Sequence, residues 1–251
     1  MVAPGAVRDG AARRLRDVRL AVSGVLFDLD GTLLDTSGPI ARSWTTWAGE
    51  HGVSSADFVR VGSHGRRSVD LVEALVPTGL VRSALARIHH LELADLDGIV
   101  PVAGAAELRT ALPDNLWGIV TSSDRRLATA RLLASDLAFA VDRLLVTGEE
   151  VTAGKPDPAP YAAGAAALGL TADRCLVVED APAGIASGVA AGARTLALTT
   201  TVARTELTLA DVVVADLRAV RVVSVGAGIV LDTDPRPDPR PDPHPQQSRG
   251  A

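Results

Sequence analysis

The stretch VLFDLDGTLLDT, Val25 to Thr36, decides the fold, because it ends an apolar run with two acids and then turns at a glycine. Residues i and i+2 of a strand project to the same face, so Asp28 and Asp30 are expected to point together at the strand's carboxyl end. Two carboxylates that lie so close repel each other. A divalent cation, a shared proton or a phosphoryl group carried in with its metal is therefore expected beside them.

Apolar runs and helical patterns alternate along most of the chain. Five runs predict strands buried on both faces, namely LAVSGVLF (20–27), LWGIV (116–120), RLLV (143–146), RCLVV (174–178) and RTLAL (194–198). Helical patterns occupy residues 124–134, 157–170 and 181–193. This alternation predicts an α/β fold, in which a Rossmann-like parallel sheet core is flanked by helices.

The segment 37–97 interrupts the alternation with helical patterns alone, at 39–52, 66–76 and 80–96. We predict an inserted all-α domain there, within a core domain formed by residues 20–36 and 98–225. Residues 1–19 are predicted to form an N-terminal arm. Residues 232–251 are predicted to be a disordered tail, because proline occupies alternate positions from Pro235 to Pro245 and excludes both helix and sheet ladders.

Composition narrows the function classes. A hydrophobic content of 47% and a net charge of −5 are typical of a globular protein and do not favour a nucleic-acid partner. The single cysteine, Cys175, excludes an intramolecular disulfide and favours a reducing compartment. No apolar run approaches the roughly 20 residues that span a bilayer, and no secretory signal is recognisable. We expect a cytoplasmic monomer with no membrane partner.

Polar residues follow three of the predicted strands. The pairs are Asp28 and Asp30, Thr121 and Ser122, and Glu179 and Asp180. In an open parallel sheet the binding crevice lies outside the carboxyl ends of the strands, so these residues are expected to converge there. Four carboxylates at one crevice require positive charge. Hard oxygen ligands beside an expected phosphate favour Mg²⁺ over softer metals.

Lys155 is the only lysine in the chain, and every other basic residue apart from histidine is arginine. A lysine retained in such a sequence suggests a site that needs a compact ammonium group rather than a planar guanidinium. It lies in GKPDP, where the glycine and the prolines indicate a loop that enters a helix.

These motifs, DLDGT, a Thr-Ser pair after a strand, GKPDP and VVEDAPAG, resemble in order and context the four motifs of the haloacid dehalogenase superfamily. The resemblance covers about Val22 to Val214. It implies the core fold described above with a small helical cap of the C1 type. The run GSHGRRSVD together with EDAPAG looks most like the sugar- and polyol-phosphate phosphatases of the superfamily, so the expected partner is a small phosphate ester.

The resemblance also implies a mechanism. Asp28 would attack phosphorus as the nucleophile and form an aspartyl-phosphate, while Asp30 would act as general acid and then as general base. Mg²⁺ would be bound by Asp28, by the backbone carbonyl of Asp30, and by Asp180 and Glu179. The phosphoryl oxygens would be held by Thr121, the backbone amide of Ser122 and Lys155, with Gly31 and Thr32 shaping the loop around the phosphate.

The helical insert would close over the crevice and select the substrate. His64, Arg66 and Arg67 are the candidate substrate contacts, and the competing interpretation is that they are solvated surface groups. Trp44 and Trp47 are expected to pack inside the insert rather than bind a ligand.

Three functions stay open. The first is a magnesium-dependent phosphatase acting on a sugar or polyol phosphate. The second is a phosphomutase of the β-phosphoglucomutase type, although Thr32 stands where such mutases often have an apolar residue. The third is a non-catalytic regulatory protein that binds a phosphate ligand, and the intact Asp28, Asp30, Lys155 and Asp180 argue against it.

Overall fold

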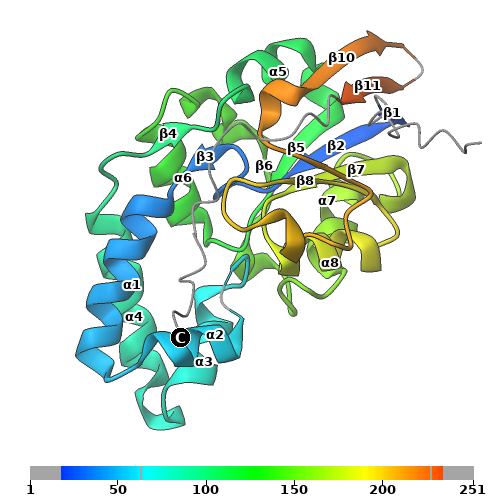
Figure 1. Cartoon of the computed structure of the whole chain (residues 1–251). Coiled ribbons are helices and arrows are strands. Elements are labelled where there is room, and N and C mark those ends of the chain that lie inside the picture. Colours follow the sequence, from blue (N-terminus) through cyan, green and yellow to red (C-terminus); the bar gives the residue numbers. More distant parts are fainter. Residues whose placement is uncertain (1–17, 63, 227, 234–251) are drawn as a thin grey trace, which may run out of the picture.

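The computed structural model describes residues 18–62, 64–226 and 228–233. Its centre is a six-stranded parallel sheet with the strand order β6-β5-β2-β7-β8-β9 (Figure 1). These strands are β2 (Gly24–Phe27), β5 (Trp117–Val120), β6 (Leu144–Val146), β7 (Cys175–Glu179), β8 (Arg194–Leu198) and β9 (Val212–Val214). The predicted α/β fold with a parallel sheet is confirmed.

The central strands are apolar at every position because helices cover both faces of the sheet. Val25 and Phe27 of β2 pack on one face with helices α5 (Ala105–Ala111) and α6 (Arg125–Leu133), whereas Leu26 packs on the other face with α7 (Ala159–Ala167). Helix α8 (Pro182–Ala190) covers strands β7 and β8. Side chains that alternate between two buried faces require an unbroken apolar run.

The predicted helices match the structure within their ranges: α6, α7 and α8 lie inside 124–134, 157–170 and 181–193. Short 3₁₀ turns join several elements. They are η1 (Thr78–Leu80), η2 (Asp114–Leu116), η3 (Ala138–Arg143), η4 (Gly148–Glu150), η5 (Ala172–Arg174), η6 (Arg204–Glu206) and η7 (Leu217–Ala219). Among the described residues, we find no helix with the length and apolar character that crossing a membrane demands.

The predicted strand 20–27 is two strands in different sheets, and this corrects the sequence analysis. The chain breaks at Ser23, whose backbone N–H donates to the carbonyl of Arg174 at 2.7 Å. Residues before the break form β1 (Val18–Val22), which pairs antiparallel with β11 (Ile229–Thr233), and β11 pairs with β10 (Val220–Val225). Both halves of the run are apolar, so hydrophobicity alone could not locate the break.

The second sheet also changes the predicted boundaries. Val18 and Arg19, assigned to the arm, and Asp232 and Thr233, assigned to the disordered tail, all lie in paired strands. An ion pair of 2.9 Å between Arg19 and Asp232 fastens this pairing. The rest of the predicted arm and tail, residues 1–17 and 234–251, lies outside the described residues.

The segment 37–97 contains α1 (Ser37–His51), α2 (Ser55–Val61), α3 (Ser68–Leu75) and α4 (Val81–Ala94), which we call the helical insert. These helices lie together beside the main sheet (Figure 1). Trp47 is fully buried and its indole N–H donates to the Ala84 carbonyl at 2.8 Å, while Trp44 contacts it edge to face. The prediction that both tryptophans pack inside the insert is confirmed. Strands β3 (Leu34–Asp35) and β4 (Val100–Pro101) pair where the chain enters and leaves the insert.

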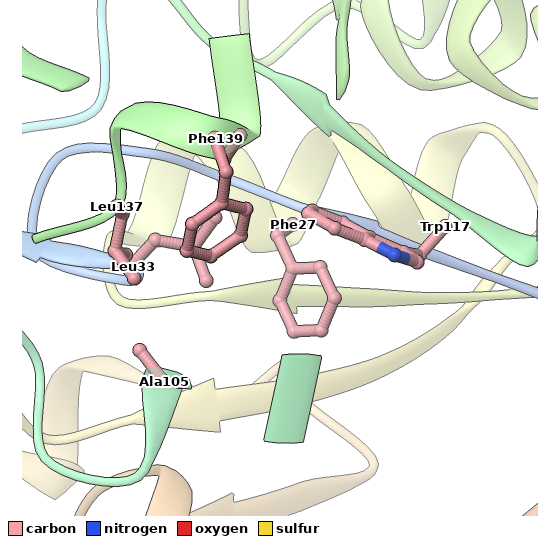
Figure 2. Close-up of a pocket in the computed structure, with 7 residues that line it drawn as sticks. Phe27, Leu33, Ala105, Trp117, Leu137 and Phe139 are labelled. Carbon is pink, nitrogen blue, oxygen red and sulfur yellow. The ribbon is translucent and has the colours of Figure 1, made fainter. Parts of the chain in front are cut away.

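A small apolar pocket lies on one face of the main sheet, between Phe27, Leu33, Trp117 and Phe139 (Figure 2). Phe27 and Trp117 meet edge to face, with ring centroids 6.0 Å apart. Every lining residue is apolar, so the pocket is a gap in core packing that offers nothing to hold a phosphate group.

Cys175 is buried at the start of β7, and burial raises the pKa of its thiol to about 11. A thiol with a raised pKa stays protonated at mildly alkaline pH, and only the thiolate is nucleophilic. We therefore expect the native protein to resist iodoacetamide, with complete alkylation once denaturant is added. Intact-mass spectrometry measures both, and rapid alkylation of the folded protein would contradict the placement of Cys175.

Candidate active site

The buried ammonium of Lys155 joins the ends of three neighbouring strands. It donates to Asp28 Oδ1 at 2.5 Å, to Glu179 Oε1 at 2.6 Å and to the carbonyl of Val120 at 3.1 Å. Asp28 follows β2, and its backbone N–H continues the sheet by donating to the Val178 carbonyl at 2.9 Å. The structure thus places Asp28, Lys155 and Glu179 together at the carboxyl edge of the sheet.

The charges in this group do not balance. Burial raises the pKa of Asp28 well above its usual range, with the Lys155 charge opposing and the Glu179 charge adding to the shift. Burial and the Glu179 charge raise the pKa of Asp180 to about 7, although a hydrogen bond from Thr201 lowers it. Burial would lower the pKa of Lys155, but its two carboxylate partners outweigh burial and raise it. One ammonium among three buried carboxylates leaves a site that attracts a further cation.

The donor set fits a hard divalent metal. Carboxylate oxygens of Asp28, Glu179 and Asp180 lie within 4.8 Å of one another, and all three residues are buried. Oxygen ligands of this kind suit Mg²⁺. The carboxylate of Asp30 is not part of this group; a metal contact from Asp30 would use its backbone carbonyl, as predicted.

Glu179 is fully engaged in hydrogen bonds, which distinguishes it from the other two acids. Its Oε1 accepts from Lys155 and from the hydroxyl of Tyr161 at 2.6 Å. Its Oε2 accepts from the backbone N–H groups of Asp180 and Ala181 at 3.2 and 3.3 Å. These bonds make Glu179 the group that orients Lys155, and its predicted role as a metal ligand stays a prediction.

The loop after β2 is built around Asp180. Gly31 has a φ of +87°, and a Cβ there would lie 2.1 Å from Asp180 Oδ2, so both backbone and space require glycine. Thr32 is buried and its hydroxyl donates to Asp180 Oδ1 at 3.0 Å. This bond makes Thr32 a support for Asp180, and its predicted role in shaping the loop around the phosphate stays a prediction.

The loop after β5 connects the site with the helical insert. Thr121 is buried, and its hydroxyl oxygen accepts from the Ser123 N–H at 3.1 Å. Ser122 donates its hydroxyl to the carbonyl of Gly65, in the insert, at 2.8 Å. Ser123 donates to Asp30 Oδ2 at 2.8 Å. Asp30 therefore lies beside this loop, with its carboxylate turned toward Ser123.

Arg67 holds the insert against the core. Its guanidinium donates to the carbonyls of Gly148 and Val151 at 3.3 and 3.0 Å, and it forms a two-point pair with Asp70 at 2.8 and 2.6 Å. Each nitrogen of the Arg67 guanidinium therefore donates to a group of the protein itself. These bonds give Arg67 a docking role, and the predicted contact of Arg67 with substrate stays a prediction.

The other two candidates in the insert have different surroundings. His64 is exposed. Arg66 is half-buried and donates to the carbonyl of Val61, in the preceding helix, at 2.9 Å. Their loop contacts the core through Gly65, which lies against Ala181. The structure therefore brings this loop to the edge of the site.

Tyr161 is a residue of the site that the sequence analysis missed. Besides its bond to Glu179, its ring lies beneath Lys155, with the ammonium 4.9 Å from the ring centroid. Burial raises the pKa of Tyr161 well above its usual range, so the hydroxyl stays a donor. One signal was available, because Tyr161 is the only tyrosine in the chain and lies three residues after GKPDP, in the first turn of α7.

Arg131 and Glu92 were missed as well. Arg131 donates to Asp30 Oδ2 at 2.8 Å and to Glu92 Oε1 at 3.1 Å. On α6 it belongs to the buried stripe formed with Leu127, Ala128 and Leu132. A charged residue on the apolar face of a helix was the available signal, but it did not identify the partners.

The contact of Gly65 with the core predicts a selective effect of substitution. Gly65 and Gly62 both have positive φ, but a Cβ on Gly65 would lie 2.8 Å from Ala181 Cβ, whereas a Cβ on Gly62 meets no atom within 4 Å. Both alanine variants bear backbone strain of about 1–2 kcal/mol. Only Gly65→Ala should also displace the insert, so we expect a drop in kcat/KM of about tenfold or more relative to Gly62→Ala. Equal kinetics for the two variants would contradict this contact.

Comparison with known proteins identifies the family. A family model described as haloacid dehalogenase-like hydrolase matches residues 22–192. Hexitol phosphatase A of Escherichia coli (strain K12) is 34% identical over 216 residues, covering 83% of this chain and 97% of that protein. Validoxylamine A 7'-phosphate phosphatase of Streptomyces hygroscopicus subsp. limoneus is 34% identical over 202 residues, covering 78% of this chain and 94% of that protein. The crystal structure of a hydrolase from Pseudomonas syringae superposes with a TM-score of 0.70 at 25% identity, covering 78% of this chain and 94% of that structure's chain.

The chain belongs to the haloacid dehalogenase-like hydrolases. The predicted enzyme class, a phosphoric monoester hydrolase, is confirmed by these phosphatase relatives.

Proposed function

We propose that this protein is a magnesium-dependent phosphatase that hydrolyses a small sugar or polyol phosphate through an aspartyl-phosphate. The observation that carries the proposal is the buried carboxylate of Asp28, held by Lys155 at 2.5 Å beside Asp180. The names of the relatives, among them a hexitol phosphatase and a glycerol-1-phosphate phosphohydrolase, support a polyol or sugar substrate.

The first step forms the covalent intermediate. A carboxylate oxygen of Asp28 attacks phosphorus, the bond from phosphorus to the ester oxygen breaks, and Asp30 gives its proton to that departing oxygen. Lys155, Thr121 and the backbone amide of Ser122 hold the phosphoryl oxygens, where negative charge is concentrated.

The second step reverses the role of Asp30. The carboxylate of Asp30 takes a proton from water as the water oxygen attacks phosphorus, and the bond to Asp28 breaks. Inorganic phosphate leaves, Asp28 is regenerated as a carboxylate, and Asp30 is again protonated for the next cycle.

Asp28, Asp180 and the backbone carbonyl of Asp30 are the groups that would hold Mg²⁺. When bound, the metal supplies positive charge that stabilises the phosphoryl oxygens and offsets the acids. Glu179 supports the metal site indirectly, through its bonds to Lys155 and to the backbone of Asp180.

We assign the helical insert the role of a cap that shields the reaction from water and selects the substrate. Its hydrogen bond to Ser122 and the docking of Arg67 support this role. His64 and Arg66 are our candidates for contacts with substrate hydroxyl groups. A single buried cysteine fits the reducing cytoplasm, where we place the enzyme.

Phosphate release from a panel of sugar, polyol, nucleotide and glycolate phosphates, each with Mg²⁺ or with EDTA, tests the proposal. Magnesium-dependent release concentrated on sugar or polyol phosphates supports it. An isomerised sugar phosphate in place of free phosphate would instead establish a mutase. Binding of phosphate ligands without turnover would establish a regulatory protein.

A further inference from the structure

A buried arginine links the site to the helical insert. The Arg131 side chain is 3% exposed, and one of its terminal nitrogens donates to Asp30 Oδ2 at 2.8 Å and to Ser123 Oγ at 2.9 Å. Its other terminal nitrogen donates to Glu92 Oε1 at 3.1 Å. Arg131 lies on α6 of the core and Glu92 on α4 of the insert. The guanidinium therefore bridges two carboxylates that belong to different parts of the chain.

Stability alone does not explain this bridge. Removing charged groups from water costs several kcal/mol per ion, and a well-packed apolar replacement is often as stable as a buried ion pair. Burial raises the pKa of Glu92, and the Arg131 charge opposes that rise without cancelling it, so burying this acid still carries a net cost. A buried ion bridge retained at such a cost is consistent with a role in holding the bridged carboxylates in fixed positions.

The bridge leaves the two oxygens of Asp30 in unequal positions. Oδ2 accepts from both Arg131 and Ser123. Oδ1 is buried and has no hydrogen-bond partner within the part of the chain that the structure describes. One oxygen is therefore fixed by two donors, and the other is left to exchange a proton with a bound molecule.

We propose that Arg131 is a positioning residue for Asp30, and that Glu92 holds Arg131 in place from the helical insert. The inference rests on the proposed phosphatase function, in which Asp30 protonates the departing oxygen. Arg131 fixes the carboxylate through Oδ2 and leaves Oδ1 to carry the proton. Because Glu92 belongs to the insert, the correct geometry of Asp30 depends on a docked insert.

The leaving group distinguishes positioning of an acid from a general structural role. The alkoxide of a polyol phosphate leaves only with a proton from Asp30, whereas p-nitrophenolate is stable enough to leave without one. A misplaced Asp30 therefore slows formation of the aspartyl-phosphate selectively for the polyol ester, whereas the later attack of water is common to both esters. A damaged fold or a lost metal site would slow both esters alike, since Asp28 attacks phosphorus in each.

The test compares kcat/KM, which reports the steps up to departure of the leaving group, for glycerol 1-phosphate and for p-nitrophenyl phosphate in Arg131→Met. General acid catalysis contributes about 10²–10⁴-fold, so we expect a loss of about 10²-fold or more on the polyol ester and less than about tenfold on the aryl ester. Arg125→Met is the matched control, since Arg125 lies on the same helix and pairs at 2.7 Å with Glu150 on the surface. Both esters should keep their wild-type rates in this control. Equal losses on the two esters, or no loss, would overturn the inference.

Glu92→Gln provides the second variant, because it keeps Arg131 beside Asp30 and weakens only the bond to the insert. We expect the same selective loss at smaller size, with a thermal unfolding midpoint showing a folded protein. If Arg131→Met fails to fold, Glu92→Gln decides: a selective loss supports the inference, and equal losses or none overturn it. Wild-type protein that releases phosphate from neither ester would overturn the proposed function itself, and the inference with it.

Discussion

Replacing Asp28 with asparagine is expected to reduce phosphate release by about 10⁴-fold or more, because the amide cannot form the covalent intermediate. The substitution is nearly isosteric, and Lys155 keeps its bonds to Glu179 and to the Val120 carbonyl. Steady-state phosphate release on the preferred ester measures the effect. Residual activity above about one per cent of wild type would contradict the assignment of Asp28 as nucleophile.

The same variant should fold at least as stably as wild type when the metal is removed. Burial raises the pKa of Asp28, so its ionised form costs stability once the pH rises above the ordinary value of an aspartate. A neutral amide removes that cost. Thermal unfolding in EDTA at neutral pH measures it. Asp35→Asn serves as control, because Asp35 is exposed and its side chain bonds only Ser37 among the hydrogen bonds described. An inactive variant that is strongly destabilised would point to damage of the fold instead.

Replacing Lys155 with methionine should harm both stability and turnover. The change leaves Asp28 and Glu179 buried without their ammonium partner, and removing one member of a buried ion pair costs about 3–5 kcal/mol. Loss of a donor to the phosphoryl oxygens should lower kcat by about 10²-fold or more. Urea unfolding in EDTA and phosphate release measure the two effects.

The control for Lys155→Met is Arg82→Met, which removes a positive charge from the exposed face of α4. Its unfolding midpoint and rate should match wild type within error. If Lys155→Met unfolded at the same urea concentration as wild type, the buried carboxylates would not depend on the Lys155 ammonium for stability. The charge argument for the site would then be wrong.

Five of the six strands of the main sheet could be predicted from the sequence, because burial on both faces leaves a continuous apolar run. Strands β10 and β11 escaped prediction, since they are partly exposed and the pairing of β11 with β1 joins the two ends of the described chain. The break at Ser23 depends on a hydrogen bond to Arg174, far along the chain. Periodicity within a short window holds no information about such contacts.

The order of the motifs predicted which residues gather at the site, but it did not predict their partners. Asp28 follows the end of a parallel strand, and Lys155 faces the same edge of the sheet. The strand topology therefore determines that the two lie together. The partners of Thr32, Arg67 and Glu179 depend instead on side-chain directions in the folded chain. Arg131 could not be paired with Glu92, because the two meet only where the insert touches the core.

The pairing of β1 with β11 has a mechanical consequence. Val18 is opposite Thr233 in this antiparallel pair, so the ends of the described chain leave the molecule at the same point. A pulling force applied across these ends would load the hydrogen bonds of the pair one after another, in the unzipping geometry, rather than all at once. We expect this sheet to open at low force, while the parallel strands that hold the active site remain folded.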